Sequence, residues 1–271
     1  MERITVDGTM VPALGFGTSG MDTDDERYRA VSTALDAGYR HVDTAQMYGS
    51  EPAVGDAIRD ADVDREEVFV TTKLSRDNRA HDAVIESTHD SLDRLDTGYV
   101  DLLLIHSPDQ DRSHEETLDA MNELVDEGTV RNVGVSNFSV AETRVAIEHS
   151  DAPIRTNQVE YNVHERRDDL LSVCLDEGVM LTAYSPLGVG DCLDDEVLTG
   201  IADDHDRTAA QVVLRWLLQQ PLVSPIPMSS NPEHVRANAD VFDFELSGDE
   251  MHELFAIGGD PDDGLASKLG L

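Results

Sequence analysis

The chain of 271 residues carries 56 Asp and Glu against 20 Lys and Arg, a formal net charge of −36 at pH 7. So large a negative charge argues against binding to nucleic acid or to an anionic membrane surface. With 39% hydrophobic residues, the chain is long enough to bury a full core in one large α/β domain.

Lysine is nearly absent, because only Lys73 and Lys268 stand among the 20 basic residues. An acidic excess with few lysines resembles proteins of salt-loving organisms, whose molar-salt cytoplasm shortens the Debye length to roughly 3 Å and screens self-repulsion. The acidic residues recur on every predicted helix, which favours a halophilic, solvated surface over an acidic binding surface. Lys73, unlike the near-terminal Lys268, ends a predicted strand.

Compartment signals are few. Cys174 and Cys192 form neither a disulfide framework nor a metal-ligand spacing, so we expect inert thiols, no metal and a reducing compartment. The N-terminal MERITVDGTM lacks a basic segment followed by an apolar run, and no stretch of roughly 18 apolar residues occurs. The sequence therefore predicts a soluble, cytoplasmic protein.

Secondary structure can be predicted from the hydrophobic pattern. ITVDGTMVPA near the start predicts a hairpin turned by Asp7-Gly8. Eight apolar runs of strand length come next: ALGFGT, HVDTA, VFVTTKL, VDLLLIH, NVGVSN, TNQVEY, MLTAYSP and VSPIPMS. Amphipathic segments between them, several closed by Gly, predict helices, among them residues 25–38, 81–96, 116–128 and 168–178. A further helix after the last strand is predicted to be capped by Ser247.

Eight strand-helix repeats in about 250 residues match the size of a closed (β/α)₈ barrel. An open doubly wound sheet is the competing architecture, since GFGTSG has the letters of a dinucleotide-binding loop. That architecture also needs an acidic residue at the end of the next strand to hold a ribose. Asp43 is the one candidate there, and we assign it to catalysis, which disfavours the open sheet. We predict a single domain over residues 1–271: an α/β (β/α)₈ barrel with an N-terminal β-hairpin and extra helices.

Reactive side chains stand where such a barrel places its site, at the carboxyl ends of strands. Asp43 and Tyr48 follow the second strand, Lys73 ends the third, and His106 ends the fourth. An ionised Asp43 would offset the burial of Lys73, and the ammonium would favour the phenolate form of Tyr48, making it a usable acid. Each residue alone has an ordinary structural explanation, but their combination predicts one site.

The motifs GYRHVDTAQMYGSE, VTTKL, DLLLIH, GVSNF, NQVEYN, AYSPLG and IPMS resemble, in order and spacing, the aldo-keto reductases over essentially the whole chain. The resemblance implies an enzyme that binds a nicotinamide cofactor without a Rossmann fold and passes hydride to the carbonyl carbon of a small aldehyde or ketone. It implies that Tyr48 protonates the alkoxide and that His106 orients the carbonyl oxygen. It also favours a monomer or weak dimer.

The same resemblance implies ten cofactor contacts after strands five to eight. They are Ser136, Asn137 and Gln158 for the carboxamide, Tyr184 for stacking on the nicotinamide, Ser185 and Leu187 for the pyrophosphate, and Met228, Ser229, His234 and Asn238 for the adenosine end. Met228 and His234 replace the Lys and Arg that grip the 2′-phosphate of NADPH in relatives. Their loss implies use of NADPH or NADH with a lean toward NADH.

Two departures concern the mouth of the site. Ser19 and Ser107 stand where the family usually has Trp, so we expect an open, less apolar mouth that suits small polar aldehydes, keto sugars or keto acids. Two other functions stay open: a Schiff-base aldolase with Lys73 as nucleophile, and a non-enzymatic, cofactor-sensing subunit on the same fold. A lysine held protonated by Asp43 disfavours the first, and the complete reactive quartet disfavours the second.

Overall fold

The computed structural model of the chain describes residues 1–109, 113–188, 191–259 and 263–270. Its centre is an eight-stranded sheet in the order β10-β9-β8-β7-β6-β5-β4-β3, in which every paired strand is parallel to its neighbour. The strands are β3 (Phe16–Gly17), β4 (His41–Asp43), β5 (Phe69–Leu74), β6 (Leu102–Ile105), β7 (Val133–Ser136), β8 (Ile154–Glu160), β9 (Met180–Tyr184) and β10 (Val223–Pro225).

Two backbone hydrogen bonds close this sheet into a barrel. Gly15 N donates to Pro225 O and Gly17 N donates to Pro227 O, both at 3.0 Å, which joins the first strand segment to the last. The prolines have no N–H, so their carbonyl oxygens form the seam while Ile226 N bonds back to β9. The two seam strands are therefore shorter than the sequence predicts, although their segments run alongside each other.

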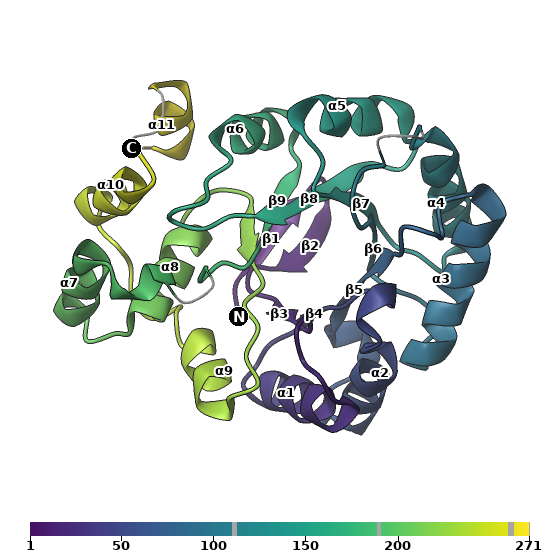
Figure 1. Cartoon of the computed structure of the whole chain (residues 1–271), viewed down its shortest axis with the longest axis horizontal. Coiled ribbons are helices and arrows are strands. Elements are labelled where there is room, and N and C mark those ends of the chain that lie inside the picture. The colour runs from purple at the N-terminus through teal and green to yellow at the C-terminus, as the bar shows by residue number, and fades with distance from the viewer. Residues whose placement is uncertain (110–112, 189–190, 260–262, 271) are drawn as a thin grey trace.

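Helices form an outer ring around the strands (Figure 1). They are α1 (Asp24–Asp36), α2 (Glu51–Asp60), α3 (His81–Leu95), α4 (Glu115–Glu127), α5 (Val140–His149), α6 (Asp168–Glu177), α7 (Glu196–Asp204), α8 (Ala209–Leu218), α9 (Pro232–Ala239), α10 (Gly248–Ile257) and α11 (Asp263–Leu269), with 3₁₀ turns η1 (Gln46–Tyr48), η2 (Arg65–Glu67) and η3 (Asp191–Asp194). Within the described ranges, no helix has both the length and the apolar character to cross a bilayer.

Capping residues set the ends of these helices. The Ser247 side chain accepts from Glu250 N, and the Glu250 side chain accepts from Ser247 N. Helix α10 therefore begins with a capping box at the residue that the sequence predicts as its cap. Helix α5 begins in the same way at Ser139. Gly128 and Gly178, with φ of 82° and 66°, end α4 and α6 in the left-handed region. The predicted helices thus agree with the observed ones to within a residue or two.

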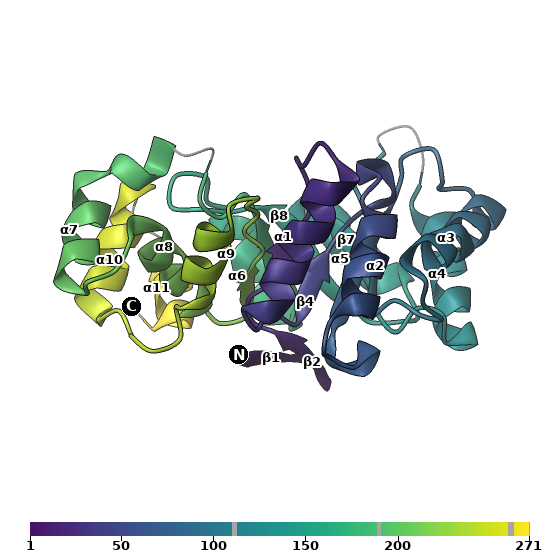
Figure 2. The ribbon, with the colours of Figure 1, turned by 90° about the horizontal axis from the view of Figure 1, so that it is seen from below.

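The N-terminal hairpin closes one end of the barrel. Strands β1 (Arg3–Val6) and β2 (Thr9–Pro12) pair antiparallel around Asp7 and Gly8, whose positive φ values of 42° and 82° suit the predicted tight turn. Val6 and Val11 belong to one buried cluster with Leu104 and with the first residues of three barrel strands, Phe69, Leu102 and Met180. The hairpin therefore lies under the barrel (Figure 2), and the opposite, carboxyl end is left for a site.

Candidate active site

A cleft of about 490 Å³ lies at the carboxyl ends of the barrel strands. Its lining includes ten of the fourteen site residues predicted from the sequence: Asp43, Tyr48, His106, Ser136, Asn137, Gln158, Tyr184, Ser185, Leu187 and Met228. It also includes Ser19, one of the two serines that stand in place of Trp. The barrel thus brings together side chains from seven strands and the loops after them.

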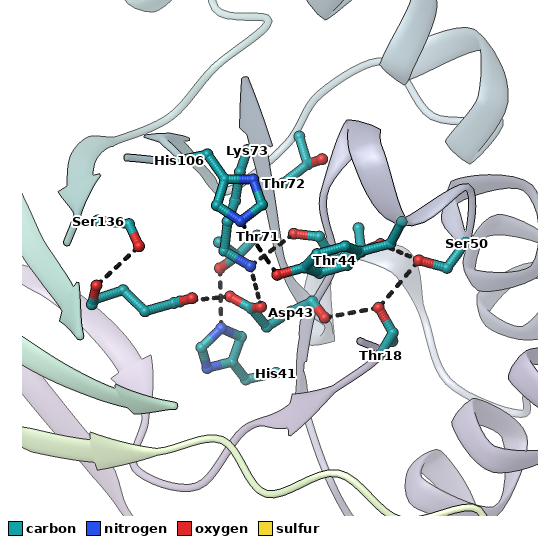
Figure 3. A network of polar contacts seen from close by, with 12 residues as sticks. Thr18, His41, Asp43, Thr44, Ser50, Thr71, Thr72, Lys73, His106 and Ser136 are labelled. Atoms are coloured by element: carbon teal, nitrogen blue, oxygen red, sulfur yellow. Dashed lines mark hydrogen bonds and ion pairs between the residues drawn. The ribbon is translucent and has the colours of Figure 1, made fainter. Parts of the chain in front are cut away.

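A buried ion pair joins Asp43, which lines the cleft, to Lys73 behind it. Asp43 ends β4, and Lys73 lies on the neighbouring strand β5, two residues beyond Thr71, the register partner of Asp43. The Lys73 ammonium pairs with Asp43 Oδ1, and it also donates to Thr44 O at 3.0 Å. The two side chains are 1% and 3% exposed, so each charge depends on the other for the solvation that water would otherwise give. Figure 3 shows this pair between His106 and His41.

The phenol of Tyr48 stands above this pair. Tyr48 ends the turn η1, and its hydroxyl lies 3.4 Å from His106 Nε2, with the two rings edge to face. Lys73 Nζ is 5.0 Å from the centre of the Tyr48 ring. The four reactive residues predicted from three strands therefore form one cluster that opens on the cleft.

His106 is a neutral group in this cluster. Burial, together with the nearby Lys73 charge, lowers the pKa of His106 to about 4, against the opposing effect of Asp43. Its Nδ1 is buried and has no hydrogen-bond partner in the described part of the chain. A bare acceptor costs less there than a buried N–H, which favours the tautomer with hydrogen on Nε2, facing Tyr48.

One wall of the cleft is a chain of amides and hydroxyls. Gln158 Nε2 donates to Asp43 Oδ2 at 2.7 Å, and Ser136 Oγ donates to Gln158 O at 2.8 Å. Tyr184 OH donates to Asn137 Oδ1 at 2.9 Å, which sets the tyrosine ring against this wall. Asn137 and Ser185 have φ of 62° and 47°, an uncommon conformation for residues other than glycine that recurs at functional sites.

Of the four residues predicted to contact the adenosine end of the cofactor, only Met228 lines the cleft. Met228 lines the end of the cleft and is 41% exposed. Ser229 Oγ accepts from Asn231 N at 3.1 Å, His234 is exposed on α9, and Asn238 is buried on the same helix. The cleft lining does not include Ser229, His234 or Asn238, so their assignment to a cofactor stays a prediction.

A hydroxyl chain beside Asp43 was not predicted. Thr18 Oγ1 donates to Asp43 O at 3.0 Å and lies 3.2 Å from Ser50 Oγ, which in turn is 2.6 Å from Thr44 Oγ1. Small hydroxyl residues are common in loops, so nothing in the sequence distinguishes these. Glu51, by contrast, faces away from the cleft, where Thr72 and Arg94 bond its carboxylate at 2.7 Å.

Cys174 does not belong to this cluster. Cys174 lies buried in α6, where burial raises the pKa of its thiol to about 12. A thiol that stays protonated is unreactive, in agreement with the expectation. The side chain of Cys192 lies outside the described residues.

His41 gives the fold below the site a pH dependence. Burial, with a smaller effect of Lys73 and against that of Asp43, lowers the pKa of His41 from 6.5 to about 4. In the unfolded chain His41 binds a proton below about pH 6.5, whereas in the folded chain it does so only below about pH 4. The free energy of unfolding therefore falls as the pH falls through this window. We expect a loss of about 2–3 kcal/mol between about pH 7 and pH 4.5 from this residue.

Urea unfolding at fixed molar salt measures this effect as the difference between wild type and His41→Phe, whose apolar ring does not titrate. Other groups titrate in both proteins and cancel in the comparison. The expected result is a smaller acid-side loss in the variant. Parallel stability curves for the two proteins across this pH window would contradict the assignment.

Comparison with known proteins decides the family. Residues 13–258 match the aldo/keto reductase family. The chain belongs to that family. It is therefore an oxidoreductase, and the barrel with its strand-end cleft is the fold of that family.

Relatives cover nearly the whole chain. A glyoxal reductase of Bacillus subtilis is 37% identical over 253 residues, which span 93% of this chain and 91% of the relative. The solved structure of a candidate 2,5-diketo-D-gluconic acid reductase B superimposes with a TM-score of 0.92 at 41% identity, covering 97% of this chain and 93% of that one. An aldo-keto reductase of Bombyx mori, solved in complex with NADP, gives a TM-score of 0.89 at 33% identity over 95% of this chain and 93% of that one.

Proposed function

We propose that the protein reduces an aldehyde or ketone to an alcohol with hydride from NADPH or NADH, and that Tyr48 is the general acid. The observation that carries this proposal is the position of the Tyr48 hydroxyl, which lies in the cleft 3.4 Å from His106 Nε2 and above the buried Lys73–Asp43 pair. A phenol so placed is flanked by a neutral hydrogen-bond donor and a fixed cation.

The residues of the cleft fit a nicotinamide cofactor. The amide nitrogen of Gln158 donates to Asp43, so the amide oxygen remains available as an acceptor in the cleft. Ser136 and Asn137 flank it, and the Tyr184 ring offers a flat apolar face. When bound, the cofactor supplies the hydride that is added to the carbonyl carbon. We assign the amides and hydroxyls to the carboxamide, and the Tyr184 ring to the orientation of the nicotinamide plane.

The remaining chemistry falls to Tyr48, His106 and Lys73. Tyr48 OH and His106 Nε2 are close enough for one carbonyl oxygen to contact both. His106 Nε2–H orients this oxygen, and the Tyr48 hydroxyl gives it a proton as negative charge develops there. The Lys73 ammonium stabilises the phenolate that remains, and Asp43 keeps the ammonium in place. One proton and one hydride convert the carbonyl to the alcohol.

The mouth of the cleft suggests small polar substrates. Ser19 lines it, and Ser107 comes directly after His106, so neither position supplies the aromatic wall that is usual in the family. Relatives named for glyoxal and for a diketo sugar acid agree with this polarity. We therefore propose small polar aldehydes, keto sugars or keto acids as the substrate class.

A panel of these carbonyl compounds with each cofactor, at molar salt, tests the proposal. We expect carbonyl-dependent oxidation of NADH or NADPH. Cofactor binding without turnover on any member of the panel would instead favour the cofactor-sensing subunit. The aldolase alternative is disfavoured because Lys73 is buried, bonded to Asp43 and Thr44, and outside the cleft lining.

Cofactor preference depends on the Met228 end of the cleft. We propose that the enzyme uses both cofactors with a lean toward NADH, because Met228 offers no cation to a 2′-phosphate, and Arg236 bonds the Pro232 carbonyl of its own helix. We expect Met228→Lys to raise the NADPH-to-NADH ratio of kcat/KM about tenfold, the effect of one charge-assisted hydrogen bond of roughly 1.5 kcal/mol.

Steady-state kinetics with both cofactors at one salt concentration measure this ratio. Met228→Gln, which adds a polar group of similar length without a charge, is the matched control and should change the ratio little. A wild-type preference for NADPH of more than about a hundredfold, roughly 2.7 kcal/mol, would contradict the proposed lean.

A further inference from the structure

The Gln158 side chain touches both the acid system and the cleft, and the role inferred for it rests on the proposed function. Taken as whole residues, Asp43 is 2% exposed and Gln158 is 3% exposed. Asp43 Oδ1 pairs with Lys73, and its second oxygen, Oδ2, receives Gln158 Nε2 at 2.7 Å. The buried carboxylate is thus held from both sides, by a cation and by an amide.

Chemistry fixes the orientation of that amide. A carboxylate only accepts hydrogen bonds, so the nitrogen of Gln158 faces Asp43 and the oxygen faces the other way. Gln158 lines the cleft, and none of the described residues donates to its Oε1. Its backbone is fixed as well, because Gln158 O accepts from Ser136 Oγ at 2.8 Å and from Asn137 N at 2.9 Å. One rigid side chain therefore presents an acceptor to the cleft and a donor to Asp43.

We propose that Gln158 is a positioning residue that couples the occupied cofactor site to the acid Tyr48. Its Oε1 binds the carboxamide, and its Nε2 holds Asp43 Oδ2. Without that donor, Asp43 is free to turn both oxygens toward Lys73 and to draw the ammonium away from Tyr48. The coupling predicts that the proton-transfer function of Tyr48 depends on the donor of Gln158, while cofactor affinity depends on its acceptor.

The variant Gln158→Glu tests the donor function of the side chain separately from its acceptor function. Protonated, the introduced carboxyl keeps a donor for Asp43 and an acceptor for the cleft; ionised, it keeps only acceptors and repels Asp43. Burial and the Asp43 charge favour its protonated form at the acid end of the pH range. The titratable groups around the position are Asp43, Lys73, His41, His106, Tyr48 and Tyr184. The pKa of both histidines is lowered to about 4, so neither changes charge above pH 5.5.

We expect kcat of Gln158→Glu to lie within about threefold of wild type at about pH 5.5 and to fall at least about tenfold below wild type by about pH 8. Over the same range, the dissociation constant of NADH or NADPH, measured by isothermal titration calorimetry, should stay within about threefold of wild type. Circular dichroism at each pH verifies the fold.

Gln211→Glu is the matched control. Gln211 is also a buried glutamine whose Nε2 donates to an oxygen, here Asp240 O at 2.9 Å, but it lies on α8 far from the acid system. As the third residue of a capping box it accepts from Thr208, a role that Glu also fills. Its pH profile should match that of wild type. This control removes any effect of one added carboxyl on the stability or charge of the protein.

A wild-type pH profile for Gln158→Glu would overturn the coupling and leave the reductase proposal standing. Equal losses of kcat and of cofactor affinity would overturn it too, since Gln158 would then be a cofactor ligand only. If Gln158→Glu does not fold, Gln158→Met is expected to lower kcat at least about tenfold at every pH, and an unchanged kcat overturns the proposal. Failure of the proposed function itself would appear earlier, as a wild-type protein without carbonyl reduction.

Discussion

Replacing Tyr48 by Phe is expected to lower kcat for carbonyl reduction about a thousandfold while cofactor affinity changes less than about twofold. The hydroxyl is the group that gives the proton, and no other described side chain in the cleft combines a dissociable proton with contact to His106 Nε2. The substitution removes one oxygen whose hydrogen-bond partner is His106, so the ring and its edge-to-face contact should remain.

Single-turnover reduction with pre-bound cofactor measures the chemical step, and calorimetry measures cofactor affinity. Tyr28→Phe is the control, because it removes the same atom from a tyrosine whose hydroxyl bonds Asp60 on the exterior. A Tyr48→Phe variant that keeps more than about a tenth of wild-type turnover would remove Tyr48 from the role of acid.

The strand-end quartet could be predicted from the sequence because each member ends a short apolar strand or comes soon after one. Parallel strands bring their carboxyl ends to one side, so Asp43, Lys73 and His106 had to lie near one another once a barrel was predicted. The hairpin turn at Asp7-Gly8 and the helix cap at Ser247 were predictable for a different reason, since each depends on residues only a few positions apart.

Polar contacts across the barrel and between its loops could not be predicted. Gln158 and Asp43 are 115 positions apart, and their hydrogen bond depends on where β8 faces across the barrel. The seam between Gly15 and Pro225 depends on how the sheet closes, and the Thr18–Ser50 contact depends on two loops that meet in space. Neither periodicity nor composition carries this information.

Breaking the buried ion pair should have the largest effect on stability. Lys73→Met leaves the Asp43 carboxylate inside the protein without its cation, and we expect the free energy of unfolding to fall by about 3–5 kcal/mol. Activity should fall at least about a hundredfold, because the phenolate of Tyr48 loses the charge that stabilises it. Urea unfolding at fixed molar salt gives the first quantity, and single-turnover kinetics give the second.

The double variant Asp43→Asn with Lys73→Met separates the structural role of the pair from its catalytic role. The introduced amide has the shape of the carboxylate, still accepts from Gln158 Nε2, and carries no charge, so no unpaired ion stays buried. We expect it to recover at least about half of the stability lost in Lys73→Met, because removing one partner costs more than removing both. Activity should not recover, since neither the cation nor its anchor is present. A double variant no more stable than Lys73→Met would mean that the loss comes from the shape of the lysine side chain rather than from the charge of Asp43, and the electrostatic account of this pair would then be wrong.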